Sequence, residues 1–145
     1  MDVKSLSLII LPQRFAICRL FPDEPIPNFL IRSPFWSITR TSDELSVVLS
    51  EEIVPADWKA ETGWRCLKVI GPLDFDLTGS LASLAMPLCE AGVSIFVIST
   101  YDTDYLLNAR TSITLFCART SITITYFKRL HMCSSQVQSN SLSRL

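Results

Sequence analysis

Two short polar turns hold the residues of this 145-residue chain that are best suited to bind a small molecule. The first turn, residues 71–79, carries Asp74 and Asp76 between two glycines, and the second, residues 99–104, reads Ser-Thr-Tyr-Asp-Thr-Asp. Carboxylates such as those of Asp102 and Asp104 can hold a cationic group through charge-assisted hydrogen bonds. Nearly everything between the turns is apolar. The pattern predicts a small scaffold that presents polar groups to a ligand.

The chain lacks the combinations of side chains on which catalysis usually depends. Its single histidine, His131, lies in a tail rich in Ser and Gln, so no Ser/His/Asp or Cys/His set can be assembled in the folded part. Asp102 and Asp104 are too few ligands for a metal, and Asp74 with Asp76 suits helix capping as well as acid–base work. Glycine-rich phosphate loops and basic patches interleaved with aromatics are missing. We therefore expect no enzyme activity, no catalytic residue, no metal, no cofactor and no nucleic-acid partner.

Strands must flank the two turns and position them. Trp64–Ile70 is rich in strand-forming residues and is ended by Gly71-Pro72. Val93–Ile98 is apolar throughout, which is typical of a buried central strand. Tyr105–Leu107 begins the strand after the second turn.

A helix is expected between the first turn and Val93. Its apolar face is predicted by residues that repeat at helical spacing, namely Leu81, Leu84, Leu88 and Ala91. Asp76 or Thr78 is expected to cap its first turn, Pro87 to kink it and Gly92 to end it.

The N-terminal part reads as two β-hairpins separated by a loop. Leu6–Leu11 and Phe15–Leu20 form the first predicted hairpin, and Phe35–Thr41 with Leu45–Ser50 the second. Four prolines exclude a long helix or central strand from residues 21–34, apart from one helical turn near Asn28–Ile31. Residues 53–63 look polar and irregular, and the nearby Trp58 and Trp64 are interpreted as packing residues.

Composition places the chain in the globular class. It is 48% apolar and 19% charged, with a net charge of −1, so it can bury a core and shows no global preference for nucleic acid or anionic membrane. No run reaches the ~18 apolar residues that span a bilayer, and Leu6–Leu11 is interpreted as a strand rather than a signal peptide. Five widely spaced cysteines without a CxxC pair predict core thiols at Cys18, Cys66 and Cys89 and a cytoplasmic location.

The charge pattern breaks after the second turn. All 14 acidic residues lie at or before Asp104, so residues 1–107 carry a net charge of −6 and residues 108–145 one of +5. In the second part, Ala109–Thr114 recurs nine residues later as Ala118–Thr123, and residues 132–145 are expected to be disordered. Two interpretations stay open. The tail either completes the sheet with Ile113–Phe127 or is the product of a retained intron, a frameshift or an alternative end, and we favour the second.

The segment from Trp64 to Leu107 resembles the ACT domain. The resemblance rests on Gly71-Pro72-Leu73-Asp74-Phe75, Thr78-Gly79 and Ser94–Leu107, and it covers about residues 5–107 when Phe35–Thr41 and Glu44–Val48 are included. It is closest to the ACT units of aspartate-kinase regulatory regions and CASTOR arginine sensors, and to small stand-alone ACT proteins with a β-rich N-terminal half. It implies an α+β fold in which a ferredoxin-like βαββαβ unit follows a β-rich, degenerate ACT-like half.

The resemblance also implies a division of the chain. The β-rich half would span residues 1–60 and the ACT domain residues 61–108, while residues 109–145 would form a divergent tail. The C-terminal helix and strand of the ACT unit would then be missing or replaced, because the sequence after Asn108 offers no charged amphipathic helix.

The function that this family implies is regulatory binding of an amino acid at the interface between two ACT units. The ligand would be a free amino acid such as arginine, lysine or threonine, and the chain would pair with itself or with another ACT unit. Backbone amides at the start of the helix suit the ligand's carboxylate, and Asp102 or Asp104 suits its ammonium or guanidinium group. The positions that match the family's binding segments are Asp74, Phe75, Thr78, Gly79, Ser99, Thr100, Tyr101, Asp102, Thr103 and Asp104. The alternative is a protein–protein interaction module that keeps the fold but binds no ligand.

Overall fold

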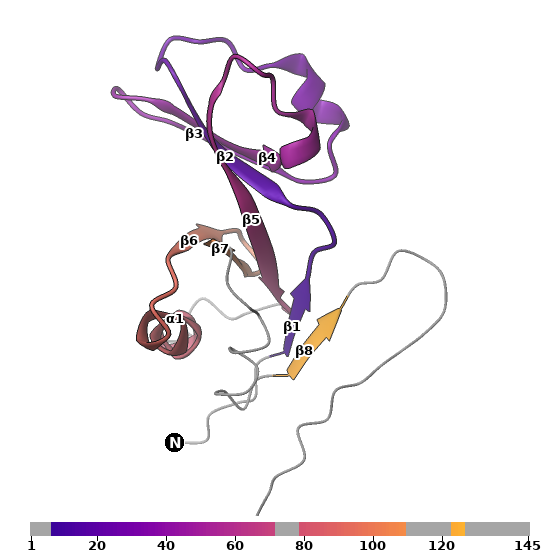
Figure 1. Ribbon diagram of the computed structural model, residues 1–145, viewed down its shortest axis with the longest axis vertical. Coiled ribbons are helices and arrows are strands. Elements are labelled where there is room, and N and C mark those ends of the chain that lie inside the picture. Colours follow the sequence, from indigo (N-terminus) through magenta and orange to yellow (C-terminus); the bar gives the residue numbers. More distant parts are fainter. Residues whose placement is uncertain (1–6, 72–78, 110–122, 127–145) are drawn as a thin grey trace, which may run out of the picture.

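The computed structural model describes residues 7–71, 79–109 and 123–126 of the chain (Figure 1). Within these ranges the chain forms an eight-stranded sheet, one α-helix and two short 3-10 helices. The strands are β1 (Ser7–Ile10), β2 (Phe15–Leu20), β3 (Trp36–Arg40), β4 (Leu45–Ser50), β5 (Lys59–Val69), β6 (Ile95–Ser99), β7 (Asp104–Ala109) and β8 (Thr123–Tyr126). The helices are η1 (Asn28–Arg32), η2 (Glu51–Ile53) and α1 (Ser80–Glu90).

The long strand β5 joins the two parts of the sheet. Its first half pairs with β2, and its second half pairs with β1 on the same edge and with β7 on the other, so that Lys68 lies between Ile9 and Tyr105. The predicted hairpin of residues 6–20 is therefore wrong in its pairing, since β1 and β2 follow one another along β5. The expectation of an irregular segment up to residue 63 is also wrong, because β5 already begins at Lys59.

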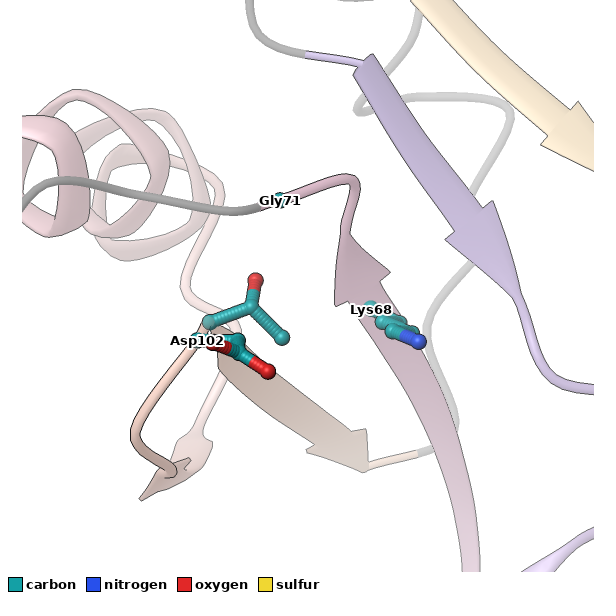
Figure 2. Close-up of a pocket in the computed structure, with 4 residues that line it drawn as sticks. Lys68, Gly71 and Asp102 are labelled. Atoms are coloured by element: carbon teal, nitrogen blue, oxygen red, sulfur yellow. The ribbon is translucent and has the colours of Figure 1, made fainter.

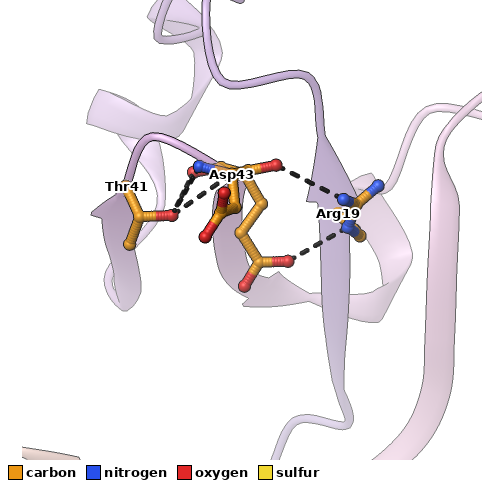
Figure 3. A network of polar contacts seen from close by, with 4 residues as sticks. Arg19, Thr41 and Asp43 are labelled. Carbon is orange, nitrogen blue, oxygen red and sulfur yellow. Dashed lines mark hydrogen bonds and ion pairs between the residues drawn. The ribbon is translucent and has the colours of Figure 1, made fainter.

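The second predicted hairpin is confirmed. β3 and β4 pair antiparallel, and the Thr41 hydroxyl accepts hydrogen bonds from the backbone N–H groups of Asp43 and Glu44, both at 3.2 Å. Figure 3 shows how Arg19 of β2 holds this turn from the side, with Nε 3.1 Å from a Glu44 carboxylate oxygen and a second nitrogen 3.3 Å from the Asp43 carbonyl. The helical turn expected near Asn28 is η1.

Helix α1 covers one face of the second part of the sheet. Its buried residues Leu84 and Leu88 pack with Leu67, Val69 and Leu106 of the strands, and Leu81 and Ala91 lie against the same cluster, as their spacing predicts. Pro87 lies inside the helix, and Gly92 follows its end with φ of +70°.

Helix α1 begins after a glycine. Gly79 occupies the N-cap position with φ of +83° and no side-chain hydrogen bond, whereas Asp76 and Thr78, the predicted capping residues, lie outside the described residues. A glycine fits because a left-handed backbone is costly for other residues.

The opposite face of the sheet is covered by the β3–β4 hairpin. Phe35 lies between Phe15, 5.2 Å away between ring centroids, and Tyr105, 5.0 Å away, and this cluster includes the buried Cys66 and Leu107. A further core lies beneath η1 and η2, where Trp58 packs, and Trp64 packs in the Phe35 cluster, so both tryptophans are packing residues as predicted.

Two other expectations need correction. β6 pairs only with β7 among the described strands, so it is an edge strand with half-buried side chains rather than a buried central strand. Cys18 and Cys66 are buried as expected, but Cys89 is exposed on α1.

The part of the chain after residue 109 is described only at β8, whose strand lies parallel to β1 (Figure 1). That pairing places Thr123–Tyr126 in the sheet, as the first interpretation of the tail expects, whereas the origin of the tail stays a prediction. The division at residue 60 falls inside β5 and likewise stays a prediction. No helix in the described ranges is long and apolar enough to cross a membrane.

Candidate functional site

A pocket of about 310 Å³ lies where β5 ends and the turn between β6 and β7 passes it. Its described lining consists of Lys68 and Gly71 from the end of β5 and Asp102 and Thr103 from the turn. Figure 2 shows Gly71 and Asp102 on the two chain segments that flank the pocket, with Lys68 on the strand beside them. Gly71 and Asp102 are exposed, so the pocket is open to solvent.

Thr103 fixes the position of the turn. Its side chain is buried, and its hydroxyl donates a hydrogen bond of 2.6 Å to the Val69 carbonyl at the end of β5. Thr100 closes the turn from the other side, because its backbone N–H and its hydroxyl both donate to the Thr103 carbonyl, at 2.8 and 2.9 Å. These bonds hold Asp102 between them at the mouth of the pocket.

The two aspartates of the turn have different environments. Asp104 accepts a 2.6 Å hydrogen bond from the Ser99 hydroxyl, so one of its carboxylate oxygens is engaged within the turn. Asp102 lines the pocket, and among the described residues it forms no hydrogen bond or ion pair. Asp102 is therefore the carboxylate that is available to a ligand.

Lys68 is the cationic residue on the lining of this pocket, and Figure 2 shows its side chain extending away from Asp102. Its Nζ lies 5.7 Å from the centroid of the Tyr105 ring, and within the described ranges no carboxylate forms an ion pair with it. A pocket that carries one anionic and one cationic side chain is suited to a zwitterion. Sequence analysis missed Lys68, although a lysine near the end of an apolar strand and three residues before Gly71 is a usable signal.

The structure brings only some of the predicted binding residues together. Asp102 and Thr103 line the pocket, while Ser99, Thr100 and Asp104 build the turn. Tyr101 lies in the same turn and is 81% exposed. Gly79 lies at the start of α1, where an added Cβ would meet nothing within 4 Å, so its positive φ rather than a close approach explains the glycine. Asp74, Phe75 and Thr78 lie outside the described residues.

The buried cysteines are poor nucleophiles. Burial raises the pKa of the Cys66 thiol to about 12 and that of Cys18 to about 11, from an ordinary value of 9.0. Both thiols are consequently protonated at neutral pH, and a protonated thiol is a weak nucleophile. Across the described residues, no three His, Cys, Asp or Glu side chains gather as a metal site requires.

Comparison with known proteins decides the family. A family model described as an ACT domain matches residues 59–107, which contain β5, α1, β6 and β7. This part of the chain belongs to the ACT domain family. A second family model, described as an N-terminal domain, matches residues 13–57 of this ACT protein. The α+β, ACT-like fold expected from the sequence is thus confirmed.

Among its relatives, the ACT protein is similar to cytosolic arginine sensor for mTORC1 subunit 1 of Mus musculus. The two are 32% identical over an alignment of 82 residues, and the match covers 51% of this chain and 25% of the mouse protein. The ACT protein therefore spans about a quarter of the length of this curated relative.

Solved structures show the same architecture. A crystal structure of a protein from Agrobacterium tumefaciens is 35% identical, with a TM-score of 0.78, and the match covers 90% of this ACT protein and 100% of that chain. An aspartate kinase from Clostridium acetobutylicum matches with a TM-score of 0.55 over 82% of this chain and 35% of the kinase. At 11% identity the likeness to the kinase shows the fold alone.

Proposed function

We propose that this ACT protein is a non-catalytic regulatory module that binds a free amino acid in the pocket between β5 and the β6–β7 turn. The observation that carries the proposal is the pair of opposite charges, Asp102 and Lys68, on the lining of one open pocket. Asp102 would hold the ammonium group and Lys68 the carboxylate, because charge-assisted hydrogen bonds to both ends select a zwitterion. The similarity to a mouse arginine sensor supports the same class of function.

The second part of the sheet supports a ferredoxin-like arrangement for this unit. β5, β7 and β6 lie in that order, α1 covers one face, and β1 pairs antiparallel with β5 on the edge away from β7. In this proposal β1 takes the place of the final strand of a βαββαβ unit. The N-terminal half then supplies the strand next to β5, and β8, from the sequence after Asn108, pairs with β1 instead.

A second ACT unit would complete the site. Gly71 and Asp102 are exposed at the pocket mouth, and a bound amino acid would keep much of its surface in solvent unless another subunit covered it. We therefore place the ligand at an interface between two ACT units, either two copies of this chain or this chain and another ACT protein. A cytoplasmic location belongs to the same proposal and is supported by the similarity to the mouse protein, a cytosolic sensor.

A thermal-shift screen against the twenty free amino acids tests the proposal. A ligand that binds only the folded state at about 100 times its Kd adds about 2.7 kcal/mol to the free energy of unfolding, so one or a few amino acids should raise the melting temperature by several degrees. Arginine, lysine and threonine are the first candidates. Asp102→Asn should abolish the shift, because it keeps the shape of the side chain and removes its charge.

The other hairpin turn offers a matched control. Asp43 occupies the same position in the turn 41–44 as Asp102 does in the turn 100–103, and it is likewise exposed. Asp43→Asn should leave the ligand-induced shift unchanged. If the folded chain responds to no amino acid, the alternative of an interaction module without ligand takes the place of this proposal.

A further inference from the structure

The Lys68 side chain makes contacts beyond the amino-acid pocket. Its two neighbours in the sheet are Ile9 of β1 and Tyr105 of β7. Residues directly opposite each other in adjacent strands carry their side chains on the same face, so both neighbours are within reach of the lysine. Of the two, only Tyr105 has a ring whose face attracts a cation. The lysine makes this contact, since its Nζ lies 5.7 Å from the centroid of the Tyr105 ring.

The Tyr105 ring is itself held in place by the N-terminal half. Phe35, which directly precedes β3, lies 5.0 Å from it between ring centroids, with the two ring planes at 55°. Phe15 of β2 packs edge-on against Phe35 at 5.2 Å and is completely buried. Favourable aromatic pairs have their centroids about 4.5–7 Å apart. The position of the Tyr105 ring therefore depends on the packing of the N-terminal half.

One ammonium group cannot serve the Tyr105 ring and the far side of the pocket at the same time. Figure 2 shows the Lys68 side chain extending away from Asp102, although both residues line the pocket. The ammonium and carboxylate groups of an amino acid are attached to one carbon atom. When Asp102 holds the ammonium group, Lys68 reaches the carboxylate only by turning toward Asp102.

We propose that the Phe35–Tyr105 ring pair lowers the affinity of the pocket for amino acids by retaining the Lys68 ammonium on the Tyr105 ring. The inference rests on the proposed function, in which Lys68 binds the carboxylate of an amino acid. Binding then exchanges the contact with the ring for a charge-assisted hydrogen bond to the carboxylate. The N-terminal half consequently helps to set the affinity through Phe35, which is not part of the described pocket lining.

The size of the effect follows from the strength of a contact between an ammonium group and a ring. A solvent-accessible contact of this kind changes an equilibrium constant about two- to fivefold. Tyr105→Leu removes the ring, so the concentration of amino acid that gives a fixed rise in melting temperature should fall about two- to fivefold. Tyr105→Phe keeps the ring and should behave as the parent chain does.

Phe35→Leu tests the contribution of the N-terminal half. It removes the ring that fixes Tyr105, so it should also strengthen binding, although it changes no residue of the described pocket lining. Phe29→Leu is the matched control, because Phe29 forms a ring pair with Trp58 in the same half, 5.9 Å apart. Its substitution should leave the affinity unchanged.

The measurement is the melting temperature in a dilution series of an equimolar mixture of the twenty free amino acids. Each chain is compared with its own melting temperature without the mixture, so a difference in basal stability does not affect the result.

Nuclear magnetic resonance follows Lys68 in the parent chain and needs no variant to be stable. With isotope-labelled lysine, the ε-CH2 protons of Lys68 should lie upfield of those of the exposed Lys59, because a ring face shields nearby protons. Lys68→Arg identifies the signal by its loss. The amino-acid mixture should move the Lys68 signal toward that of Lys59. The corresponding amino-acid amides, which have no carboxylate, should leave it in place.

The outcomes separate this inference from the proposed function. If the mixture neither raises the melting temperature nor moves the Lys68 signal, the chain binds no amino acid and both proposals are wrong. If the mixture raises the melting temperature but the Lys68 signal stays in place, an amino acid binds and the role of the ring pair is wrong. The same conclusion follows if Tyr105→Leu leaves binding unchanged or weakens it, or if Phe29→Leu strengthens binding as much as Phe35→Leu does.

Discussion

Asp102 and Asp104 stand two residues apart in one turn, and the hydrogen bonds around them give them different chemistry. Ser99 engages Asp104, whereas Asp102 faces the pocket that Lys68 also lines. The sequence predicted the turn and its carboxylates, but it could not show which of the two aspartates is available to a ligand. That difference depends on which carboxylate lies within hydrogen-bonding distance of the Ser99 hydroxyl in the folded chain. Lys68 was missed for a similar reason: only the pairing of β5 with β7 brings it beside the turn.

Cys66 allows a prediction at the same scale. Its pKa is raised to about 12 in the folded chain by burial, above the ordinary value of 9.0, so the folded state holds the proton more tightly than the unfolded state. The resulting stabilisation is complete below pH 9 and is lost as the pH rises toward 12. The free energy of unfolding should therefore fall with a contribution of up to about 1.4 kcal/mol per pH unit above pH 9.

Denaturant unfolding at several pH values between 8 and 11 measures this slope. Cys66→Ala lowers stability at every pH by leaving a cavity, but it should make the alkaline slope shallower. Cys89→Ala removes an exposed thiol and serves as the control whose slope should match the parent. If the alkaline slope of Cys66→Ala equals that of the parent chain, the Cys66 thiol is not the source of the pH dependence.

At the level of elements, the β6–β7 turn depends on one buried hydroxyl. Thr103 donates to the Val69 carbonyl at 2.6 Å and is only 6% exposed. Thr103→Val keeps the shape of the side chain and leaves that carbonyl without its donor, which should cost about 1–3 kcal/mol of stability. Amino-acid binding should weaken as well, because the turn that carries Asp102 loses its anchor to β5.

Urea unfolding and the amino-acid titration measure the two effects separately. Thr39→Val is the matched control, since Thr39 lies exposed on β3 and its hydroxyl has no hydrogen-bond partner among the described residues. A Thr103→Val chain with unchanged stability would show that the turn is held by its backbone alone.

Which elements form was largely predictable, and which strands pair was not. The helical spacing of Leu84 and Leu88, the turn at Thr41–Glu44 and the strand after Asp104 are local patterns that the structure confirms. The pairing of β1 with β5 joins residues about sixty positions apart, and local periodicity carries no information on such a contact. The β-branched and aromatic residues of β6 suited a central strand equally well, because α1 and the Phe35 cluster half-bury both faces of this edge strand.

For the whole molecule, β5 makes the two halves one cooperative unit. The strand contributes to the core beneath α1 through Leu67 and Val69 and to the core beneath η1 and η2 through Ala60. A loss of packing under α1 should therefore destabilise the distant hairpin too. Leu84→Ala tests this, since Leu84 is 1% exposed and its truncation should cost about 2–5 kcal/mol.

Two probes follow the two halves during denaturant unfolding. Far-ultraviolet circular dichroism at 222 nm reports on α1, and tryptophan fluorescence reports on Trp36, Trp58 and Trp64, none of which packs in the core cluster of that helix. If β5 couples the halves, both transitions in Leu84→Ala should move to lower denaturant by the same amount. Met86→Ala, at a 57% exposed position of the same helix, should move neither. If the fluorescence transition stays in place while the helical signal shifts, the N-terminal half unfolds independently of the part that contains α1. In that case β5 connects the two halves without coupling their free energies of unfolding.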